Sequence, residues 1–336
     1  MSSSLPIRTA LSLIAVIALV AACSGSTGGL GSVPTSPPTA SAEPTSPDLT
    51  PGPSASAGAS EEPTEPSDEP SGAPDPSTAP STPVTTPAPS GTMIVRAYFV
   101  LGGEVGVVGL VPVLREVPKS TAVARAAMTA LLAGPTNAEA GDRQISTAIP
   151  DGTTLLGVSA KNGVATVNLS TEYDSGGGSA SMQFRLAQVV YTLTQFSTIK
   201  SVIFQIDGET ETVFGGEGIV LDGPVGRADF TNELPAIFVD RPAFGAAFAS
   251  GGRIAGNANV FEATFRVAVL DAAGNQLADE GVMATCGTGC RGTFSTTVSY
   301  TVGKAQWGTL RAYEPSAQDG TPVNVRDYPV WLTPGG

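Results

Sequence analysis

The apolar residues that follow position 92 recur with the spacing of β-strands. β-branched and aromatic side chains are concentrated in Met93–Leu101, Val105–Leu114 and Ser201–Asp207. A Gly-Gly turn separates the first two runs, and Asp207-Gly208 ends the third. Runs of this composition between turn residues are typical of strands. The pattern therefore predicts a strand in each of the three segments.

Asn162-Gly163 predicts a hairpin, because this pair favours a two-residue type I′ turn. Such a turn would place all six flanking apolar side chains on one half-buried face of a sheet. The expected pairs are Leu156 with Leu169, Val158 with Val167 and Ala160 with Ala165.

Two segments have the spacing of amphipathic helices. The first begins after Ser120 or Thr121 as N-cap, includes Val123, Ala127, Ala130 and Leu131 on its apolar side, and ends before Gly134-Pro135. The second extends from about Ser179 to Phe196, with Met182, Leu186, Val189, Val190 and Leu193 at helical spacing. Strands with two helices predict a small α+β domain whose helices pack on one sheet face.

The last third of the chain consists of short β-rich runs near the spacing of a β-sandwich. Asp271–Asn275 is expected to form a hairpin loop, and the alternation breaks around Glu262 in a way that indicates a bulge. The predicted strands after Ile237 are Gly252–Ala258, Phe261–Leu270, Gln276–Ala284, Gly292–Tyr300, Gly308–Tyr313 and Val323–Leu332.

Residues 1–22 have the pattern of a secretory signal. Arg8 precedes the uncharged run Ala10–Ala22, which is shorter than the roughly 20 apolar residues that span a bilayer as a helix. Val20-Ala21-Ala22-Cys23 resembles the bacterial lipobox, which implies cleavage before Cys23 and lipid on its sulfur. Acyl chains would then anchor the protein to the membrane. An ordinary signal peptide with an incidental cysteine is the alternative.

Residues 23–92 read as a disordered linker. From Ser24 to Thr92 there are 16 prolines, eight acidic residues, no basic residue and no aromatic one. Such a segment cannot bury enough apolar surface to offset its chain entropy. It is either a stalk that lifts the folded part from the membrane or a spacer without a required length. Residues 93–228 and 229–336 are then expected to form the two folded domains.

Several segments of the α+β part resemble the GerMN domain of bacterial sporulation and spore-germination lipoproteins. The resemblance extends over about residues 93–222 and implies an extracytoplasmic binding or assembly module without known catalysis. Its motifs are Leu131–Pro135, Ala148–Thr153, Val167–Ser170, Tyr191–Phe196 and Val202–Gly208.

The β-rich part, residues 236–334, resembles the immunoglobulin-like domain that often follows GerMN. The segments that carry this resemblance include Arg241-Pro242, Phe261–Ala263, Asp271–Gly274, Gly292–Phe294 and Asp319-Gly320. The sequence therefore predicts an α+β GerMN-like domain followed by an all-β immunoglobulin-like sandwich.

Cys286 and Cys290 are separated by Gly-Thr-Gly, so a small disulfide ring can close outside the cytoplasm. A structural disulfide is the main hypothesis. A redox role is an alternative, because strained bridges are more easily reduced. A metal site would need further soft ligands, and the folded part contains neither histidine nor another cysteine.

The absence of histidine and the charge balance exclude several functions. The chain has no histidine, which removes Ser-His-Asp and Cys-His nucleophiles and imidazole metal sites. A net charge of −13 and 6% aromatic residues also argue against a nucleic-acid partner. No cofactor is predicted.

The remaining motifs are weak evidence for catalysis. Ser197–Lys200 spells S-x-x-K, but the serine falls at a helix end and the partner motifs S-D-N and K-T-G are missing. Glycoside hydrolysis uses a carboxylate pair, for which Asp207-Gly208-Glu209 and Glu211 are candidates, yet D-G-E is typical of a turn. The acidic residues from Asp207 to Asp222, which include Glu217, could bind calcium, but their spacing is not that of an EF-hand loop. Gly215–Gly218 lacks the context of a phosphate loop.

These observations predict a non-enzymatic lipoprotein on the extracytoplasmic face of the cell membrane, of the sporulation and germination type. Its expected partners are the membrane, through the lipid anchor, and either peptidoglycan or an envelope protein. A solute-binding lipoprotein of a transporter is the first alternative, although only one α+β lobe is predicted. A cell-wall hydrolase is the second.

Overall fold

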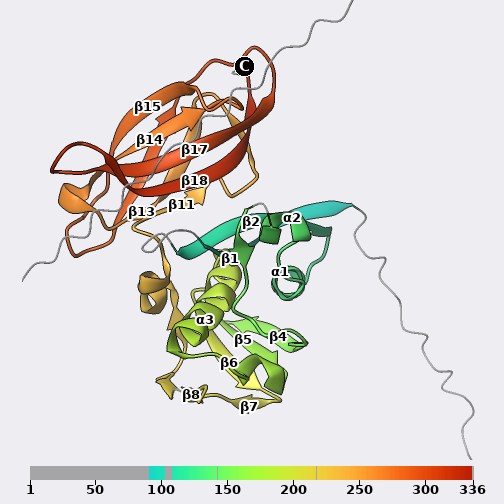
Figure 1. The fold of residues 1–336 in the computed structure, drawn as a ribbon. Helices are drawn as coiled ribbons and strands as arrows, with labels where there is room; N and C mark the ends of the chain where they lie inside the picture. The colour runs from blue at the N-terminus through green and yellow to red at the C-terminus, as the bar shows by residue number, and fades with distance from the viewer. Residues whose placement is uncertain (1–90, 103–107, 142, 217, 335–336) are drawn as a thin grey trace, which may run out of the picture. The chain divides into compact units, whose positions relative to one another are not determined.

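A computed structural model describes residues 91–102, 108–141, 143–216 and 218–334 (Figure 1). The predicted signal peptide, Cys23 and nearly all of the predicted linker lie outside these residues. No helix in the described ranges has both the length and the apolar character that crossing a bilayer requires.

The α+β part contains two main sheets rather than the single sheet that the pattern predicts. The first has the order β2-β1-β3, formed by β1 (Thr92–Leu101), β2 (Gly109–Pro118) and β3 (Ile145–Ser146). The second has the order β10-β6-β5-β4, with β7 paired to β6. Its strands are β4 (Leu155–Lys161), β5 (Val164–Leu169), β6 (Ser201–Ile206), β7 (Glu209–Thr210) and β10 (Val225–Gly226). The small hairpin β8 (Val213–Phe214) and β9 (Ile219–Val220) stands apart.

Helix α3 (Ser179–Leu193) packs against strands of both sheets, which explains why its side chains are buried over almost its whole second half. Helix α1 (Val123–Leu132) contacts α3, β1 and β4, and the short α2 (Asn137–Gly141) follows it. A one-turn 3₁₀ segment occurs at Thr171–Asp174, and a longer one, kinked at Phe230, at Arg227–Glu233. The core is therefore built between the sheets, around α3.

Three boundaries differ from the prediction. The second strand begins at Gly109 and continues to Pro118, while part of the expected start at Val105 lies outside the described residues. Ala122 is the N-cap of α1; the Ser120 hydroxyl only accepts a hydrogen bond from the Ala122 N–H, at 3.0 Å. Helix α3 ends at Leu193, and Phe196 lies in the following turn, half-buried against the core.

The predicted hairpin turn is confirmed. Asn162 and Gly163 have φ of +52° and +85°, as a type I′ turn requires. Ala160 pairs with Ala165 and Val158 with Val167, as expected. The third pair is wrong, because a bulge places Leu155 instead of Leu156 opposite Leu169, and Leu156 is exposed.

The last third forms a sandwich of two sheets, as predicted (Figure 1). One sheet has the order β11-β13-β16 and the other β12-β18-β17-β14-β15. The three strands of the first sheet are β11 (Ile237–Arg241), β13 (Gly252–Ala258) and β16 (Gly292–Val298). The second sheet contains β12 (Ala247–Ala249), β14 (Thr264–Leu270), β15 (Gln276–Met283), β17 (Gln306–Pro315) and β18 (Pro322–Thr333).

The break in alternation at Glu262 has a different cause from the bulge that we expected. Phe261–Ala263 forms a 3₁₀ turn, and both Glu262 and Ala263 have positive φ. Strand β14 therefore starts at Thr264 instead of Phe261. The Asp271–Asn275 loop is confirmed, since the Asp271 carboxylate accepts hydrogen bonds from the N–H groups of Ala273 and Asn275, each at 2.9 Å.

Candidate functional site

Two of the GerMN-like motifs face a common hollow of about 210 Å³ at the carboxyl end of α1. Leu131–Pro135 forms one wall, where Ala133 caps the helix and Gly134 turns the chain with φ +75°. Thr147 and Ile149–Thr153 form the other wall. The fold thus brings together two segments that the sequence separates.

Two polar side chains of α3 hold the second wall in place. The Gln188 side-chain oxygen accepts a hydrogen bond from the Ala148 N–H at 2.8 Å, and its amide nitrogen donates to the Tyr98 carbonyl at 3.0 Å. Arg185 donates to the Ala148 carbonyl at 3.2 Å and to the Tyr173 carbonyl at 2.5 Å. Both side chains are buried, and burial lowers the pKa of Arg185. These hydrogen bonds connect the second wall to α3.

The lining of this hollow favours binding over acid–base catalysis. Among its lining residues Asp151 carries the single ionisable side chain, beside the hydroxyl groups of Thr147 and Thr153. General acid–base catalysis needs positioned groups with matched pKa values. The hollow offers hydroxyl groups, main-chain groups and one carboxylate, which suit the recognition of a polar ligand.

A larger, mainly apolar groove of about 520 Å³ lies on the other side of Gly134-Pro135, between α1 and the end of β2. At one end of the groove, Arg115 forms two hydrogen bonds to the carboxylate of Glu139, at 2.9 and 2.7 Å. Burial raises the pKa of Glu139, but hydrogen bonds from Arg115 and Thr136 outweigh this effect and leave it lowered. Pockets of this size are typical of ligand sites.

Among the described residues, the candidate carboxylates lie in a turn and in exposed or half-buried positions around β7. Asp207 and Gly208 have φ of +46° and +93° and make the tight turn between β6 and β7, as the D-G-E interpretation predicts. Glu209 and Glu211 are exposed or nearly so; partial burial, and then the charge of Asp174, raise the pKa of Glu211. Glu217 lies outside the described residues.

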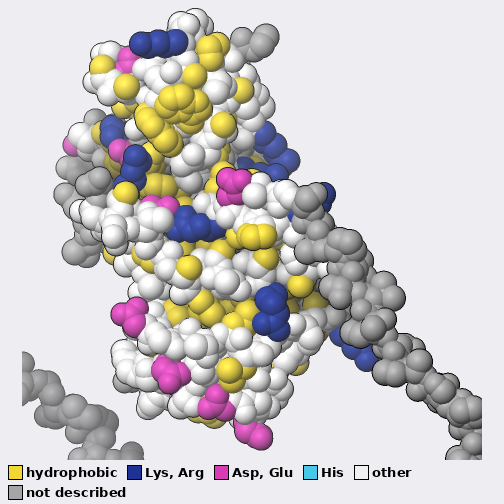
Figure 2. Space-filling view, turned by 90° about the vertical axis from the view of Figure 1, so that its right-hand side faces the viewer, with side chains coloured by type: hydrophobic (Ala, Val, Ile, Leu, Met, Phe, Trp, Pro, Cys, Tyr) yellow, Lys and Arg dark blue, Asp and Glu magenta, His cyan; other side chains and the backbone are white. Residues whose placement is uncertain are grey.

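Acidic side chains are concentrated at the end of the molecule that carries β7 and β8 (Figure 2). Asp222 lies in the exposed segment between β9 and β10. Within the described ranges, however, no three histidine, cysteine, aspartate or glutamate side chains come together as a possible metal site. These acids therefore form a solvated surface.

The S-x-x-K segment lies in the turns that follow α3. Ser197 and Lys200 are exposed, Ile199 between them is buried, and the Lys200 N–H donates to the Gly163 carbonyl at 2.7 Å. The nucleophile of the S-x-x-K enzymes stands at the start of a helix, in a site shared with its partner motifs. The segment instead joins α3 to β6.

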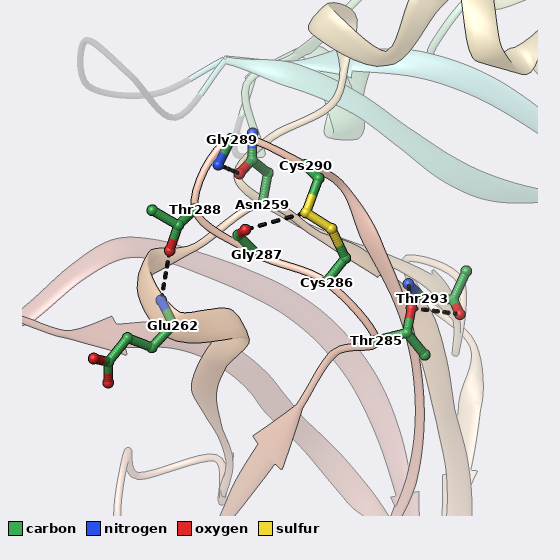
Figure 3. The surroundings of a disulfide bond; sticks show 9 residues. All are labelled: Asn259, Glu262, Thr285, Cys286, Gly287, Thr288, Gly289, Cys290 and Thr293. Atoms are coloured by element: carbon green, nitrogen blue, oxygen red, sulfur yellow. Dashed lines mark hydrogen bonds between the residues drawn. A yellow bond between two sulfur atoms is a disulfide. The ribbon is translucent and has the colours of Figure 1, made fainter.

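Cys286 and Cys290 form a disulfide in the loop between β15 and β16 (Figure 3). This loop packs on the 3₁₀ turn before β14. The Glu262 N–H donates to the Thr288 hydroxyl at 2.8 Å, and the Gly289 N–H donates to the Asn259 side chain at 3.1 Å. The bridge thus closes a loop that supports a turn with positive φ values.

Sequence reasoning missed a partly buried polar cluster between β1 and β11. The Tyr98 hydroxyl donates to Asp240 at 2.6 Å, and the Arg227 guanidinium lies 4.6 Å from the centre of the Tyr191 ring. These residues are up to 142 positions apart, so no local pattern joins them. Arg185 is different. It lies three residues after Met182 and four before Val189, so a polar residue at helical spacing within the apolar side of the predicted helix is a signal that could have been found.

Comparison with known families confirms the resemblance of both domains. The family described as "Sporulation and spore germination" matches residues 96–212, and the family described as "Immunoglobulin-like domain of bacterial spore germination" matches residues 236–321. No curated protein matches the chain.

Three solved structures are similar to parts of the chain. A candidate lipoprotein from Clostridium perfringens is 22% identical and covers 44% of this chain and 98% of its own, with a TM-score of 0.30. The tandem GerMN domains of the sporulation protein GerM from Bacillus subtilis are 18% identical, cover 62% of each chain and have a TM-score of 0.36. The first of those GerMN domains alone is 24% identical over 41% of this chain and 99% of its own, with a TM-score of 0.34.

Both families match in the predicted order, within the α+β part and the β-sandwich. The chain therefore carries a GerMN domain of the sporulation and spore-germination family, followed by the immunoglobulin-like domain of bacterial spore germination.

Proposed function

We propose that this chain is a non-enzymatic lipoprotein of the cell envelope that binds cell-wall material through its GerMN domain. The observation that supports this function best is the hollow between Leu131–Pro135 and Ile149–Thr153. Its second wall is held from behind by Arg185 and Gln188, and Asp151 is the one ionisable group among its lining residues. A preformed polar hollow without paired acid and base groups is suited to recognition.

The proposal includes an anchor at Cys23, which lies outside the described residues. The lipobox-like Val20–Cys23 would be cleaved and lipidated, and residues 23–92 would connect the membrane to domains at 93–228 and 229–336. The wild-type protein is then expected in the detergent phase, and Cys23→Ala in the aqueous phase. Equal partition of the two proteins would contradict the anchor.

Wall binding is tested by co-sedimentation of the full chain with purified peptidoglycan. Asp151→Asn and Thr153→Val should reduce the bound fraction, because both side chains line the hollow. Glu280→Gln, a change at an exposed acid of β15, is the matched control. Sedimentation that none of these changes affects would reject the hollow as the wall-binding site.

A release assay distinguishes the hydrolase alternative from the proposed binding function. Labelled peptidoglycan is incubated with the full chain, with and without calcium, and soluble fragments are measured. We expect no release by the wild type. Release that Glu209→Gln or Glu211→Gln abolishes would replace the binding function with a glycosidase.

A further inference from the structure

Strand β2 is an edge strand that is only partly covered. In the order β2-β1-β3 its single neighbour within the sheet is β1. On its other side Val113 forms a parallel bridge with Phe244, and the Phe244 N–H donates to the Pro112 carbonyl at 2.9 Å. Beyond that bridge, Arg115–Pro118 line the groove along α1. The outer edge of β2 is therefore covered at Val113 and open at Arg115–Pro118.

The open part presents unpaired main-chain groups. Neighbouring residues of a strand direct their N–H and C=O groups to opposite edges. Because Pro112 faces Phe244, the groups of Glu116 and Pro118 face the same edge, toward the groove. Among the described residues no hydrogen bond connects the outward N–H or C=O of Glu116 to another group. Pro112 and Pro118 both stand at outward positions, where a missing N–H removes no bond to β1.

The opposite wall of the groove is a helix face formed mainly by alanine side chains. Ala122, Ala126, Ala130 and Ala133 recur at helical spacing along it. Arg125 is exposed on the rim, and no ion pair to it occurs among the described residues. An extended chain could therefore lie between β2 and α1, with an aliphatic side chain toward the alanines and a carboxylate beside Arg125.

We infer that this groove binds an extended, acidic segment of another envelope protein, which adds to β2 as a further strand at Glu116. Strand addition takes its affinity from main-chain hydrogen bonds and its specificity from pockets for alternate side chains. The segment would continue the pairing that Phe244 begins at Val113. This inference depends on the proposed function only in placing the partner outside the cytoplasm.

The test uses the full chain in detergent and a fluorescein-labelled peptide, Thr-Val-Glu-Val-Glu-Thr. Fluorescence anisotropy measures binding of the peptide. Glu116→Pro removes the outward N–H and should weaken binding about tenfold, whereas Glu116→Ala keeps that N–H and should stay within about twofold of wild type. Thr-Val-Lys-Val-Lys-Thr should bind at least about fivefold more weakly, because Arg125 would repel it. Thermal melting checks that both variants are folded.

Amide hydrogen exchange supplies a second readout that does not need a variant. Saturating peptide should slow exchange of the Glu116 N–H, and the Asp151→Asn protein should bind the peptide like wild type. The inference is overturned if folded Glu116→Pro binds as tightly as Glu116→Ala. It is also overturned if the Glu116 N–H is already protected in the full chain and the peptide does not bind, since the chain's own acidic residues 61–70 would then be the occupant. Failure of wall binding leaves these results unchanged, so the two proposals can fail separately.

Discussion

Buried and half-buried arginines in this protein are held mainly by carbonyl oxygens. Arg185 donates to the carbonyls of Ala148, Tyr173, Ser175 and Gly176. Arg291 donates to Pro235 and to the Asn257 side chain, each at 3.0 Å. A guanidinium carries five donors in a fixed fork, so one side chain can satisfy several main-chain groups that water does not reach. These arginines therefore fix loops.

Glu233 is the opposite case, a buried acid at the end of the 3₁₀ segment Arg227–Glu233. It is 9% exposed, and its Oε2 has no hydrogen-bond partner among the described residues. Burial raises its pKa above the ordinary value of 4.5. As the pH rises above that value, the unfolded chain releases a proton that the folded chain retains, so stability falls.

We therefore expect Glu233→Gln to melt at a higher temperature than wild type at pH 7, with a smaller difference at pH 4. A glutamine side chain does not titrate, so the variant does not lose this part of its stability as the pH rises. Thermal melts at the two pH values measure the effect, and Glu280→Gln on the exposed face of β15 is the control. A gain of equal size at both pH values would show that the acid is not the cause.

At the scale of single elements, the β4–β5 hairpin shows how far local chemistry sets the structure. Gly163 has φ +85°, and a Cβ built there would meet its nearest neighbour, Lys200 Cγ, at 3.8 Å. There is room for a side chain, but a β-branched residue strongly disfavours this backbone conformation. The glycine is therefore needed for its conformation and not for its size.

Gly163→Val is expected to lower the free energy of unfolding by about 1 kcal/mol or more, through backbone strain. Urea unfolding measures the loss. Asn162→Gly should be tolerated, because glycine adopts the φ of +52° found at that position without strain. If the valine variant were as stable as wild type, the assigned turn would be wrong.

The loop between β15 and β16 is held by its disulfide and by contacts to the turn at Phe261–Ala263. The bridge closes a ring between Cys286 and Cys290, and for so short a ring loop entropy predicts a stabilisation of about 2 kcal/mol. Replacing both cysteines by serine should lower the free energy of unfolding by about that amount, and dithiothreitol should have the same effect on wild type. Denaturant curves that coincide with and without reductant would contradict this role.

At the scale of the whole molecule, Arg326 joins the two domains. This residue of β18 is 1% exposed, and it donates to the Gly109 carbonyl of β2 at 3.0 Å and to the Leu101 carbonyl of β1 at 3.5 Å. Removing it would leave two buried carbonyl groups without these donors, which is costly. The contact connects strands that are more than 200 positions apart.

Wild type is expected to unfold in one calorimetric transition, and Arg326→Leu in two, because the domains would lose a buried connection. Arg311→Leu is the control, since the Arg311–Asp327 ion pair is exposed and stays within the sandwich. A single transition in both variants would show that other contacts, such as Tyr98 with Asp240, are enough to couple the domains.

The sequence alone determined those features that depend on neighbouring residues. Asn162-Gly163 predicted its turn and Gly134-Pro135 predicted the end of α1, because local backbone preferences decide these features. The order of motifs predicted both domains through their resemblance to known families. It did not determine the bulge at Leu155, the 3₁₀ turn at Glu262 or the division of the first domain into two sheets.

Only the tertiary structure decided where the candidate sites lie. Leu131–Pro135 and Ile149–Thr153 meet because α3 fixes the second segment through Gln188 and Arg185. The open edge of β2 exists because Phe244, from the other domain, stops covering it after Val113. Hydrogen bonds and packing between distant segments produce both results, and no local pattern of residues records which distant segments will meet.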